Sequence, residues 1–402
     1  MTLARETTKT RTIVANLFDD KVRIDLDPSH HNENTFDYYD RSARNDVSNV
    51  RQKLNDWFSG YPLSEQKELK SRFKKTFSSA YFELFIHELF KRQGFEIVIH
   101  PEVPNSSKRP DFLLKKNGLE FYLEAKEARD KSAAQQALEN RINQVYDSLN
   151  KIKSPNFLLC IDELILKTAN QPSTRKAIEK IQTDSAKYDP DFLTDQLTRY
   201  GLERRATIEY EDVDLKLVVS LIPKGPAART SDGGRAIGMY PFETTWGGSE
   251  GSIKESFAKK ANRYGDLDKP YVICINAIGM KGNGEIDVEN ALWGSIAWTW
   301  STDPNNPDER WERQLDGIFH DKKSPRCTNV SGVLVTKVME FNIHVAQHWF
   351  AKHPYSKNEL DFSIFELSHA FVSEGKIKKE SKKTIADILQ VEATWLDAKQ
   401  MT

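Results

Sequence analysis

The sequence predicts an α/β protein with a mixed central sheet flanked by helices. Three observations support this fold class: a helix pattern at 78–93 with apolar residues on most sides, a hairpin signal within 111–126, and a mostly apolar strand pattern at 156–161. The length of 402 residues suffices for one large domain with extensions or for two to three smaller domains. The sheet and its helices are therefore expected to form a core within a longer chain.

The expected elements follow one another in a fixed order. Residues 78–93 read as a largely buried helix that ends at Gly94, and 96–103 read as a first strand. After the hairpin, 132–153 has apolar residues at helical spacing and is stopped by Pro155. The apolar run 156–161 suits an interior strand. The predicted order is helix, three strands, helix, strand.

A tight turn at Asn117-Gly118 sets the geometry of the hairpin. Both positions of a two-residue type I′ loop need positive φ, which Asn and Gly tolerate best. Counting outward from this turn brings Asp111 opposite Glu124 on the neighbouring strand. The second strand alternates apolar and polar residues, so Lys126 shares a face with Glu124.

Two facing carboxylates predict a cation site. Like charges directly opposite each other in a sheet are unfavourable unless positive charge lies between them. Mg²⁺ suits such oxygen ligands, because it usually takes one or two carboxylates and fills its octahedron with water and phosphate oxygens. A solvated sheet face is the simpler reading of the same residues.

The pattern Pro110-Asp111 followed by Glu124-Ala125-Lys126 resembles the PD-(D/E)XK nuclease superfamily, the restriction-endonuclease-like proteins. The predicted order of elements is also the order found in that family. The resemblance implies a Mg²⁺-dependent endonuclease, with Mn²⁺ as substitute, in which Asp111 and Glu124 hold the metal and Lys126 activates water. Family members often serve restriction, repair or antiphage defence, which makes restriction or antiphage defence the expected role.

The first helix is expected to add a further metal ligand. Glu83 lies about three turns before Gly94, which matches the placement of a Glu in family members with a similar first helix. Glu88 competes for this role. His87 shares a helix face with Glu83 and reads as a packed residue rather than as a base.

Nucleic-acid contacts are expected around the acidic pair. Lys108 and Arg109 place positive charge beside Asp111, and Tyr122 on the same face either stacks on a base or packs against the second helix. Arg141 flanks the apolar stripe of that helix, although the Gln-x-x-x-Tyr pattern of family enzymes does not occur there.

Composition limits the other function classes. Lys and Arg number 58 against 59 Asp and Glu, so phosphate binding must come from local clusters rather than from overall charge. Three separated cysteines argue against a disulfide framework or structural zinc, and no apolar run is long enough to span a bilayer. The sequence is therefore interpreted as a soluble, cytoplasmic protein without a membrane partner.

The C-terminal half carries no recognised chemistry. Four tryptophans between 293 and 311 suggest core or subunit packing, or a base-stacking platform. His344 and His348 lie one helical turn apart, but their aromatic neighbours suggest a packed amphipathic segment rather than zinc ligands. The range 377–396 reads as an amphipathic helix.

Three hypotheses follow. The first is a metal-dependent nuclease with its core at 73–168, an N-terminal extension at 1–72 and a C-terminal α/β region at 169–402. DNA is favoured over RNA as its target, and a second copy or a partner protein remains open. The second is a catalytically silent nuclease fold that binds nucleic acid or serves assembly. The third is a protein-interaction scaffold built on the aromatic C-terminal half.

Overall fold

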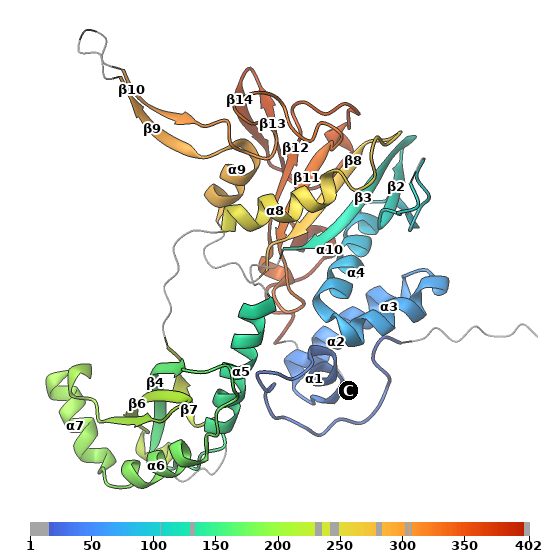
Figure 1. Ribbon diagram of the computed structural model, residues 1–402. Helices are drawn as coiled ribbons and strands as arrows, with labels where there is room; N and C mark the ends of the chain where they lie inside the picture. The colour runs from blue at the N-terminus through green and yellow to red at the C-terminus, as the bar shows by residue number, and fades with distance from the viewer. Residues whose placement is uncertain are drawn as a thin grey trace, which may run out of the picture. The chain divides into compact units, whose positions relative to one another are not determined.

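The structure is a computed structural model that describes residues 16–104, 106–128, 133–229, 235–241, 249–278, 284–301, 305 and 308–397 (Figure 1). It divides into two compact units. The described parts of 1–28, 34–130 and 246–402 form the first unit, and those of 29–33 and 131–245 form the second. Each unit has its own sheet and its own hydrophobic core.

The first unit contains a mixed sheet of eight strands in the order β1-β2-β3-β8-β11-β12-β13-β14. Strands β3, β8 and β11 run parallel to one another, as do β12 and β13, and the other neighbours are antiparallel. The strands are β1 (Glu96–Ile99), β2 (Phe112–Lys116), β3 (Leu119–Glu127), β8 (Tyr271–Asn276), β11 (Gly332–Lys337), β12 (Gln347–Lys352), β13 (His369–Ser373) and β14 (Lys376–Glu380).

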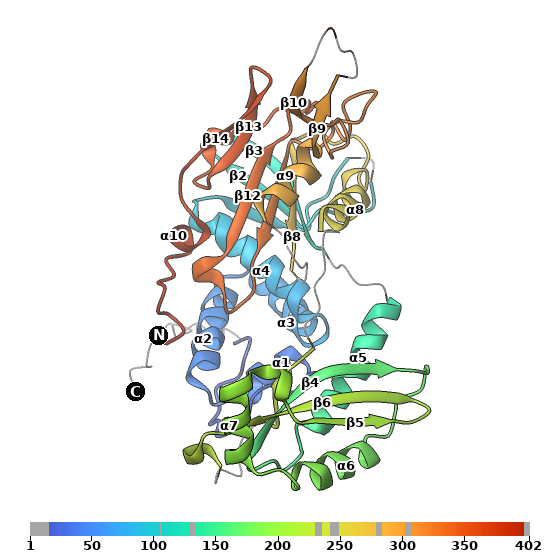
Figure 2. The same ribbon diagram turned by 90° about the vertical axis from the view of Figure 1, so that its left-hand side faces the viewer.

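Helices cover both faces of this sheet (Figure 2). One core contains Phe121 and Leu123 of β3 together with residues of α1–α4 and α10, and the other contains Tyr122 with residues of α8 and α9. The alternation of side chains along a strand explains why neighbouring residues enter opposite cores. The helices are α1 (Thr35–Arg41), α2 (Asn45–Ser59), α3 (Leu63–Lys75), α4 (Phe77–Arg92), α8 (Ser249–Ala261), α9 (Glu285–Trp293) and α10 (Ile385–Leu389).

The second unit has a four-stranded sheet in the order β5-β6-β4-β7. Its core joins apolar residues of the sheet to Val145 and Leu149 of α5, Ile181 of α6 and Leu193 of α7. Its elements are α5 (Ala133–Leu149), β4 (Phe157–Leu166), α6 (Arg175–Ser185), α7 (Pro190–Tyr200), β5 (Thr207–Glu211), β6 (Leu215–Pro223) and β7 (Ile237–Met239).

The predicted core at 73–168 is therefore wrong as one structural unit. The expected helix and strand exist as α5 and β4, but β4 pairs with β6 and β7 in the second unit. In the first sheet β3 lies between β2 and β8, and helix α8 comes before β8 in the chain. The order helix, three strands, helix, strand is present as α4, β1, β2, β3, α8 and β8, with the second unit inserted after β3.

Two C-terminal expectations also differ from the structure. Residues 347–352 form strand β12, so His344 and His348 do not lie on one helix. The predicted helix at 377–396 is instead strand β14 followed by the short α10. Strand and helix patterns are hard to separate in short apolar runs. Over the described part of the chain, no helix has the length and apolar character needed to cross a bilayer.

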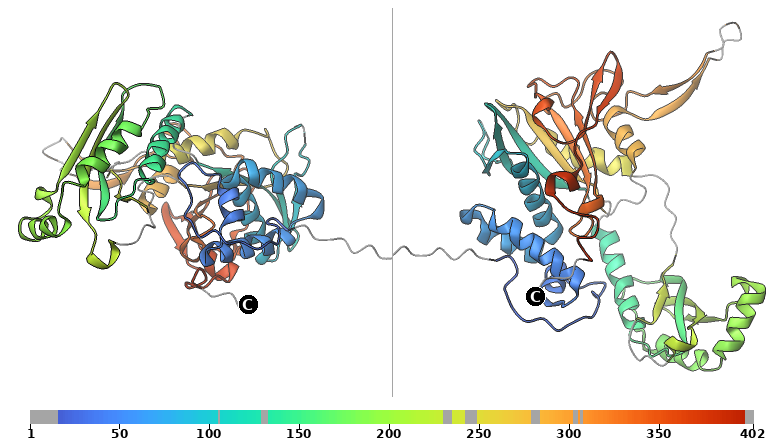
Figure 3. Two further views of the ribbon diagram at one scale, coloured as in Figure 1. Left: turned by 90° about the horizontal axis from the view of Figure 1, so that it is seen from below. Right: turned by 180° about the vertical axis from the view of Figure 1, so that it is seen from behind.

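A separate two-stranded ribbon follows α9 in the first unit (Figure 3). Its strands β9 (Ile296–Trp300) and β10 (Glu309–Arg313) are antiparallel and, among the strands that the structure describes, pair only with each other. Trp298 lies opposite Trp311 in the middle of this ribbon. The expectation that these tryptophans form core packing within the chain is wrong, because both are exposed.

Candidate functional site

The hairpin turn has the predicted geometry. Asn117 and Gly118 have φ of 51° and 79°, and Lys116 pairs with Leu119 across the turn. The register continues to Phe112 opposite Leu123, which places Asp111 beside Glu124 at the end of the ladder. The local prediction of two neighbouring carboxylates is therefore confirmed.

Asp111 is fixed by the backbone of the neighbouring strand. Its Oδ2 accepts a hydrogen bond from the N–H of Ala125 at 2.7 Å, and the residue keeps some access to solvent. Burial, together with the negative charges of Glu124 and Glu83, raises the pKa of Asp111 to about 7, against the lowering effects of the Ala125 hydrogen bond and of Lys260. Three acids therefore share one electrostatic environment.

Glu124 is buried, with 1% of its surface exposed, and is contacted by the end of α8 and the residues after it. The ammonium group of Lys260 donates to Oε1, and the Tyr264 hydroxyl donates to Oε2. The guanidinium of Arg263 lies 3.5 Å from Oε1. Positive charge thus already balances this carboxylate, as a buried anion requires.

Glu83 of α4 joins the same environment. The Tyr61 hydroxyl donates to its Oε1 at 2.9 Å, and Arg72 at the end of α3 forms an ion pair with its Oε2. The competitor Glu88 forms a different ion pair, with Arg92 at 2.7 Å. Because the charge of Glu83 acts on Asp111, Glu83 rather than Glu88 belongs with the acidic pair.

The other predicted residues have different surroundings. Lys126 is half-buried on β3 and, by alternation, faces the same way as Glu124. Lys108 and Arg109 are exposed next to Asp111, where Arg109 pairs with Glu102 at 2.7 Å. Both remain suited to phosphate contacts.

One of the predicted nucleic-acid contacts is contradicted, and another lies in the second unit. Tyr122 is 3% exposed and its hydroxyl donates to Asp268 at 3.0 Å, so its ring packs in the core and cannot stack on a base. Arg141 belongs to the second unit, where its guanidinium donates to the carbonyl oxygens of Thr168 and Asn170 at 2.8 and 3.1 Å. These hydrogen bonds fix the backbone at Thr168 and Asn170.

Sequence reasoning missed Lys260 and Tyr264. The sequence does contain a signal, because Lys260-Ala-Asn-Arg-Tyr264 has the spacing of the Gln-x-x-x-Tyr pattern, with Lys in place of Gln. The resemblance predicts this pattern on 132–153, the helix next along the chain. The helix that follows β3 within the same unit is α8, which begins at Ser249.

A divalent cation needs several oxygen or nitrogen ligands around one point. Within the described residues, no group of three or more His, Cys, Asp or Glu side chains is arranged to hold a metal ion by itself. Two carboxylates are nevertheless enough for Mg²⁺ when water and phosphate oxygens supply the other ligands. Asp111 and Glu124 fit that donor set, provided that Lys260 leaves Glu124.

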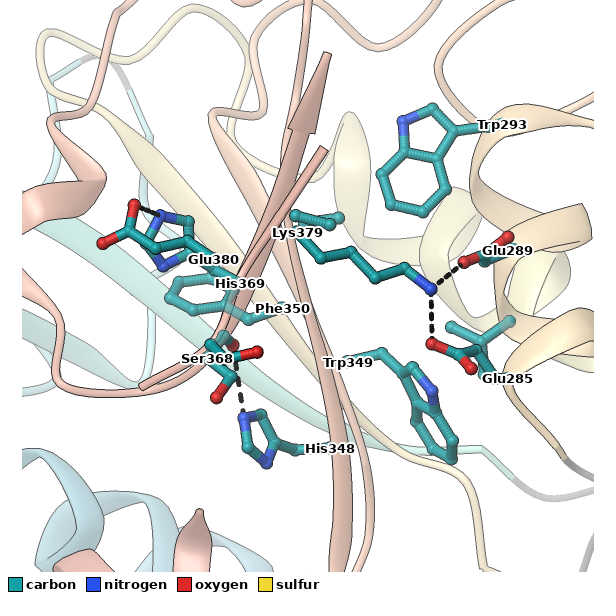
Figure 4. Close-up of a pocket in the computed structure, with 14 residues that line it drawn as sticks. Glu285, Glu289, Trp293, His348, Trp349, Phe350, Ser368, His369, Lys379 and Glu380 are labelled. Carbon is teal, nitrogen blue, oxygen red and sulfur yellow. Dashed lines mark hydrogen bonds and ion pairs between the residues drawn. The ribbon is translucent and has the colours of Figure 1, made fainter. Parts of the chain in front are cut away.

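A second candidate is a cavity of about 220 Å³ between α9 and strands β12–β14 (Figure 4). Trp293 and Trp349 line it, and Lys379 lies between Glu285 and Glu289, at 2.5 and 2.7 Å from their carboxylates. Arg313 also pairs with Glu289 at 3.2 Å, so two cations match these two carboxylates and the ion pairs are satisfied within the chain. We place the candidate site at Asp111 and Glu124 instead.

Comparisons of the chain with protein-family models, curated proteins and solved structures find no match. The site is therefore interpreted from its own residues.

Proposed function

We propose that the protein is a metal-dependent nuclease that hydrolyses phosphodiester bonds, with DNA as the favoured target and restriction or antiphage defence as its role. The proposal is carried by one observation: Asp111 and Glu124 lie side by side on antiparallel strands, and the negative charge of Glu83 also raises the pKa of Asp111. The order α4, β1, β2, β3, α8, β8 supports it, because the PD-(D/E)XK proteins that the sequence resembles have their elements in this order.

Different side chains of the protein would have different roles in hydrolysis. Asp111 and Glu124 would hold Mg²⁺, and Glu83 would complete the ligand shell directly or through water. The bound ion would polarise the scissile phosphate and lower the pKa of a water molecule. Lys126, on the face of Glu124, would orient that water or accept its proton and offset negative charge on phosphorus. Lys108 and Arg109 would attract the phosphate backbone of the nucleic acid.

A second candidate is a nuclease fold that binds nucleic acid or serves assembly without cleavage. It is favoured by the contacts of Glu124, because Lys260, Arg263 and Tyr264 together satisfy this carboxylate without a metal. A permanent ion pair at this position would exclude Mg²⁺. The two candidates differ in whether Lys260 leaves Glu124 when Mg²⁺ and nucleic acid are present.

A cleavage assay with the full chain tests the proposal. Plasmid DNA, linear duplex DNA, single-stranded DNA and RNA are incubated with Mg²⁺ or Mn²⁺. We expect cleavage that requires the metal, and a fall of about a hundredfold or more for Asp111→Asn and Lys126→Met. Glu120→Gln is the matched control, since Glu120 lies on the same strand face but pairs with Lys115 at 3.1 Å.

Two results would overturn the proposal. One is the absence of cleavage on all four substrates with either metal, which would favour the silent candidate if binding survives Asp111→Asn. The other is full activity in Lys126→Met.

A further inference from the structure

The ribbon β9–β10 has one face that is mainly aromatic. Alternation and register place Ile296, Trp298 and Trp300 of β9 on the same face as Glu309, Trp311 and Arg313 of β10. The rings of Trp298 and Trp311 meet edge to face with centroids 5.2 Å apart. The opposite face carries the smaller or polar residues Ala297, Thr299, Arg310 and Glu312.

This aromatic face is exposed in the single chain. The exposed fractions of Trp298, Trp300 and Trp311 are 41%, 63% and 69%, and that of Ile296 is 44%. An isolated two-stranded ribbon is only marginally stable in water, and contiguous exposed apolar surface usually marks an interaction site. The ribbon is therefore expected to be covered in the working protein.

The charges on the ribbon indicate what covers it. Arg310 pairs with Asp308 at 2.7 Å and lies 3.7 Å from Glu312, while Arg313 pairs with Glu289 at 3.2 Å. The cations are thus matched by acids on and beside the ribbon. Binding to nucleic acid depends on excess cations that neutralise phosphates, and this surface does not provide them. A protein surface is the better match, since aromatic residues and Arg are enriched in the centres of interfaces.

The aromatic face is complementary to itself. It consists of three rows, with Glu309 and Trp300 at the tip, Trp311 and Trp298 in the middle, and Arg313 and Ile296 at the base. A two-fold axis through the middle row lays the tip of one ribbon over the base of another. Each Trp300 then faces Ile296 of the second copy, and the middle tryptophans meet across the axis. Each Glu309 faces Arg313 of the second copy, which would share its guanidinium between this carboxylate and its own Glu289, since 25% of the Arg313 side chain is exposed.

From this arrangement we propose that two copies of the chain associate through the aromatic faces of their β9–β10 ribbons, related by a two-fold axis at the Trp298–Trp311 row. Such an isologous contact closes on itself, as most homodimer contacts do. The contact area is small against the roughly 800 Å² per partner of a standard interface, so the association depends on concentration. The proposal is independent of any nuclease activity, because none of these residues belongs to the acidic site.

Sedimentation velocity of the full chain over a wide concentration range tests the contact. We expect a monomer–dimer equilibrium that weakens at least about tenfold in Trp298→Ser and in Trp311→Ser. Thr299→Ser, which lies on the opposite face of the same strand, should leave the equilibrium unchanged. Thermal melting of each variant reports whether the fold is intact, and we expect no loss because these side chains are exposed.

Mixing two charge variants tests the predicted orientation. Glu309→Arg and Arg313→Glu should each weaken self-association, because each places like charges together at both ends of the contact. An equimolar mixture of the two variants should associate as a heterodimer, because both ends then carry opposite charges. A Trp298→Cys variant should also form a disulfide-linked dimer on oxidation, whereas Thr299→Cys should not.

The proposal is overturned by a monomer at every concentration, by dimers that persist unchanged in both tryptophan variants, or by a charge-variant mixture that remains monomeric. Loss of DNA binding in the tryptophan variants of a monomeric protein would assign the face to nucleic acid instead.

Discussion

Lys260 forms an ion pair with Glu124 that joins the end of α8 to the middle of β3. Both side chains are largely buried, with exposed fractions of 12% and 2%. The ammonium group occupies the position where the proposed function requires a metal to bind Glu124. If the proposed function is correct, Lys260 competes with that metal, and the first prediction tests this competition.

The first prediction concerns Lys260→Gln. Loss of the ammonium group should raise the affinity of the nucleic-acid-free protein for Mn²⁺ by about tenfold, measured by calorimetry. The same change should lower the free energy of unfolding by about 1–3 kcal/mol without metal, because Glu124 stays buried with fewer partners. Lys259→Gln, at an exposed neighbour that pairs with Glu255, should change neither quantity appreciably. Equal metal affinity in both variants would argue against competition.

The second prediction concerns the pH dependence of metal binding. The pKa of Asp111 is raised to about 7, so this carboxyl must lose its proton when it binds a cation near neutral pH. Affinity for Mg²⁺ should therefore fall by about tenfold for each pH unit below that pKa. Titrations at a series of pH values check this, with Asp111→Asn as control. The dependence should disappear in the variant.

The same shift has a consequence for stability without metal. The folded protein holds the Asp111 proton more tightly than the unfolded chain, whose pKa is near 3.8. The contribution of this proton to the free energy of unfolding is fully present below pH 3.8, and it is lost as the pH rises to about 7. Added Mg²⁺ should recover it above pH 7, as a rise in melting temperature. A rise of equal size in Asp111→Asn would contradict this explanation.

The third prediction concerns the turn that sets the register of Asp111 and Glu124. Gly118 has φ of +79°, and nothing lies within 4 Å of an added methyl group, so Gly118→Ala should cost about 1–2 kcal/mol through backbone strain alone. Gly251 in α8 also has open space around it, but in a helix the same change should stabilise by about 0.5–1 kcal/mol. Urea denaturation of the two variants should therefore give shifts of opposite sign.

The fourth prediction concerns acid sensitivity at His353. Burial lowers the pKa of His353 to about 4, from an ordinary value of 6.5. Its Nδ1 accepts from the Tyr355 N–H at 3.0 Å, so the ring donates from Nε2 to the Arg326 carbonyl at 2.8 Å. The neutral ring satisfies both contacts, and a second proton would break one of them.

This histidine therefore stabilises the fold at neutral pH and loses that contribution as pH falls from about 6.5 to 4. The loss reaches at most about 3 kcal/mol, because the unfolded chain takes up the proton first. Unfolding free energies measured across this window should fall less steeply in His353→Gln. His30→Gln, at an exposed position, should keep the steep dependence.

Local features of the site could be predicted from the sequence, because short-range chemistry determines them. The positive φ values that Asn117 and Gly118 tolerate fix the turn, and the turn fixes the register that brings Asp111 beside Glu124. The helix α4 was also predictable, because nearly every side of it is apolar.

Long-range features could not be predicted in the same way. An apolar stripe shows that one side of α5 is buried, but it does not show which sheet buries it. The pairing of β3 with β8 depends on packing between segments far apart in the chain, which periodicity does not record. The contacts of Lys260 follow from that pairing and were missed. Packing of Tyr122 was one of the two alternatives expected, but the helices it packs with are α8 and α9 rather than 132–153.

The insertion of the second unit after β3 has a consequence for the order of folding. Glu124 and Lys260 are separated by 136 residues, and the main part of the second unit, 131–245, lies within that interval. During synthesis, the inserted unit emerges complete while β3 still lacks its neighbour β8. The edge of β3 that pairs with β8 is then expected to stay unpaired, and the contacts of Glu124 with Lys260 and Tyr264 can form only after about two thirds of the 402-residue chain has been made.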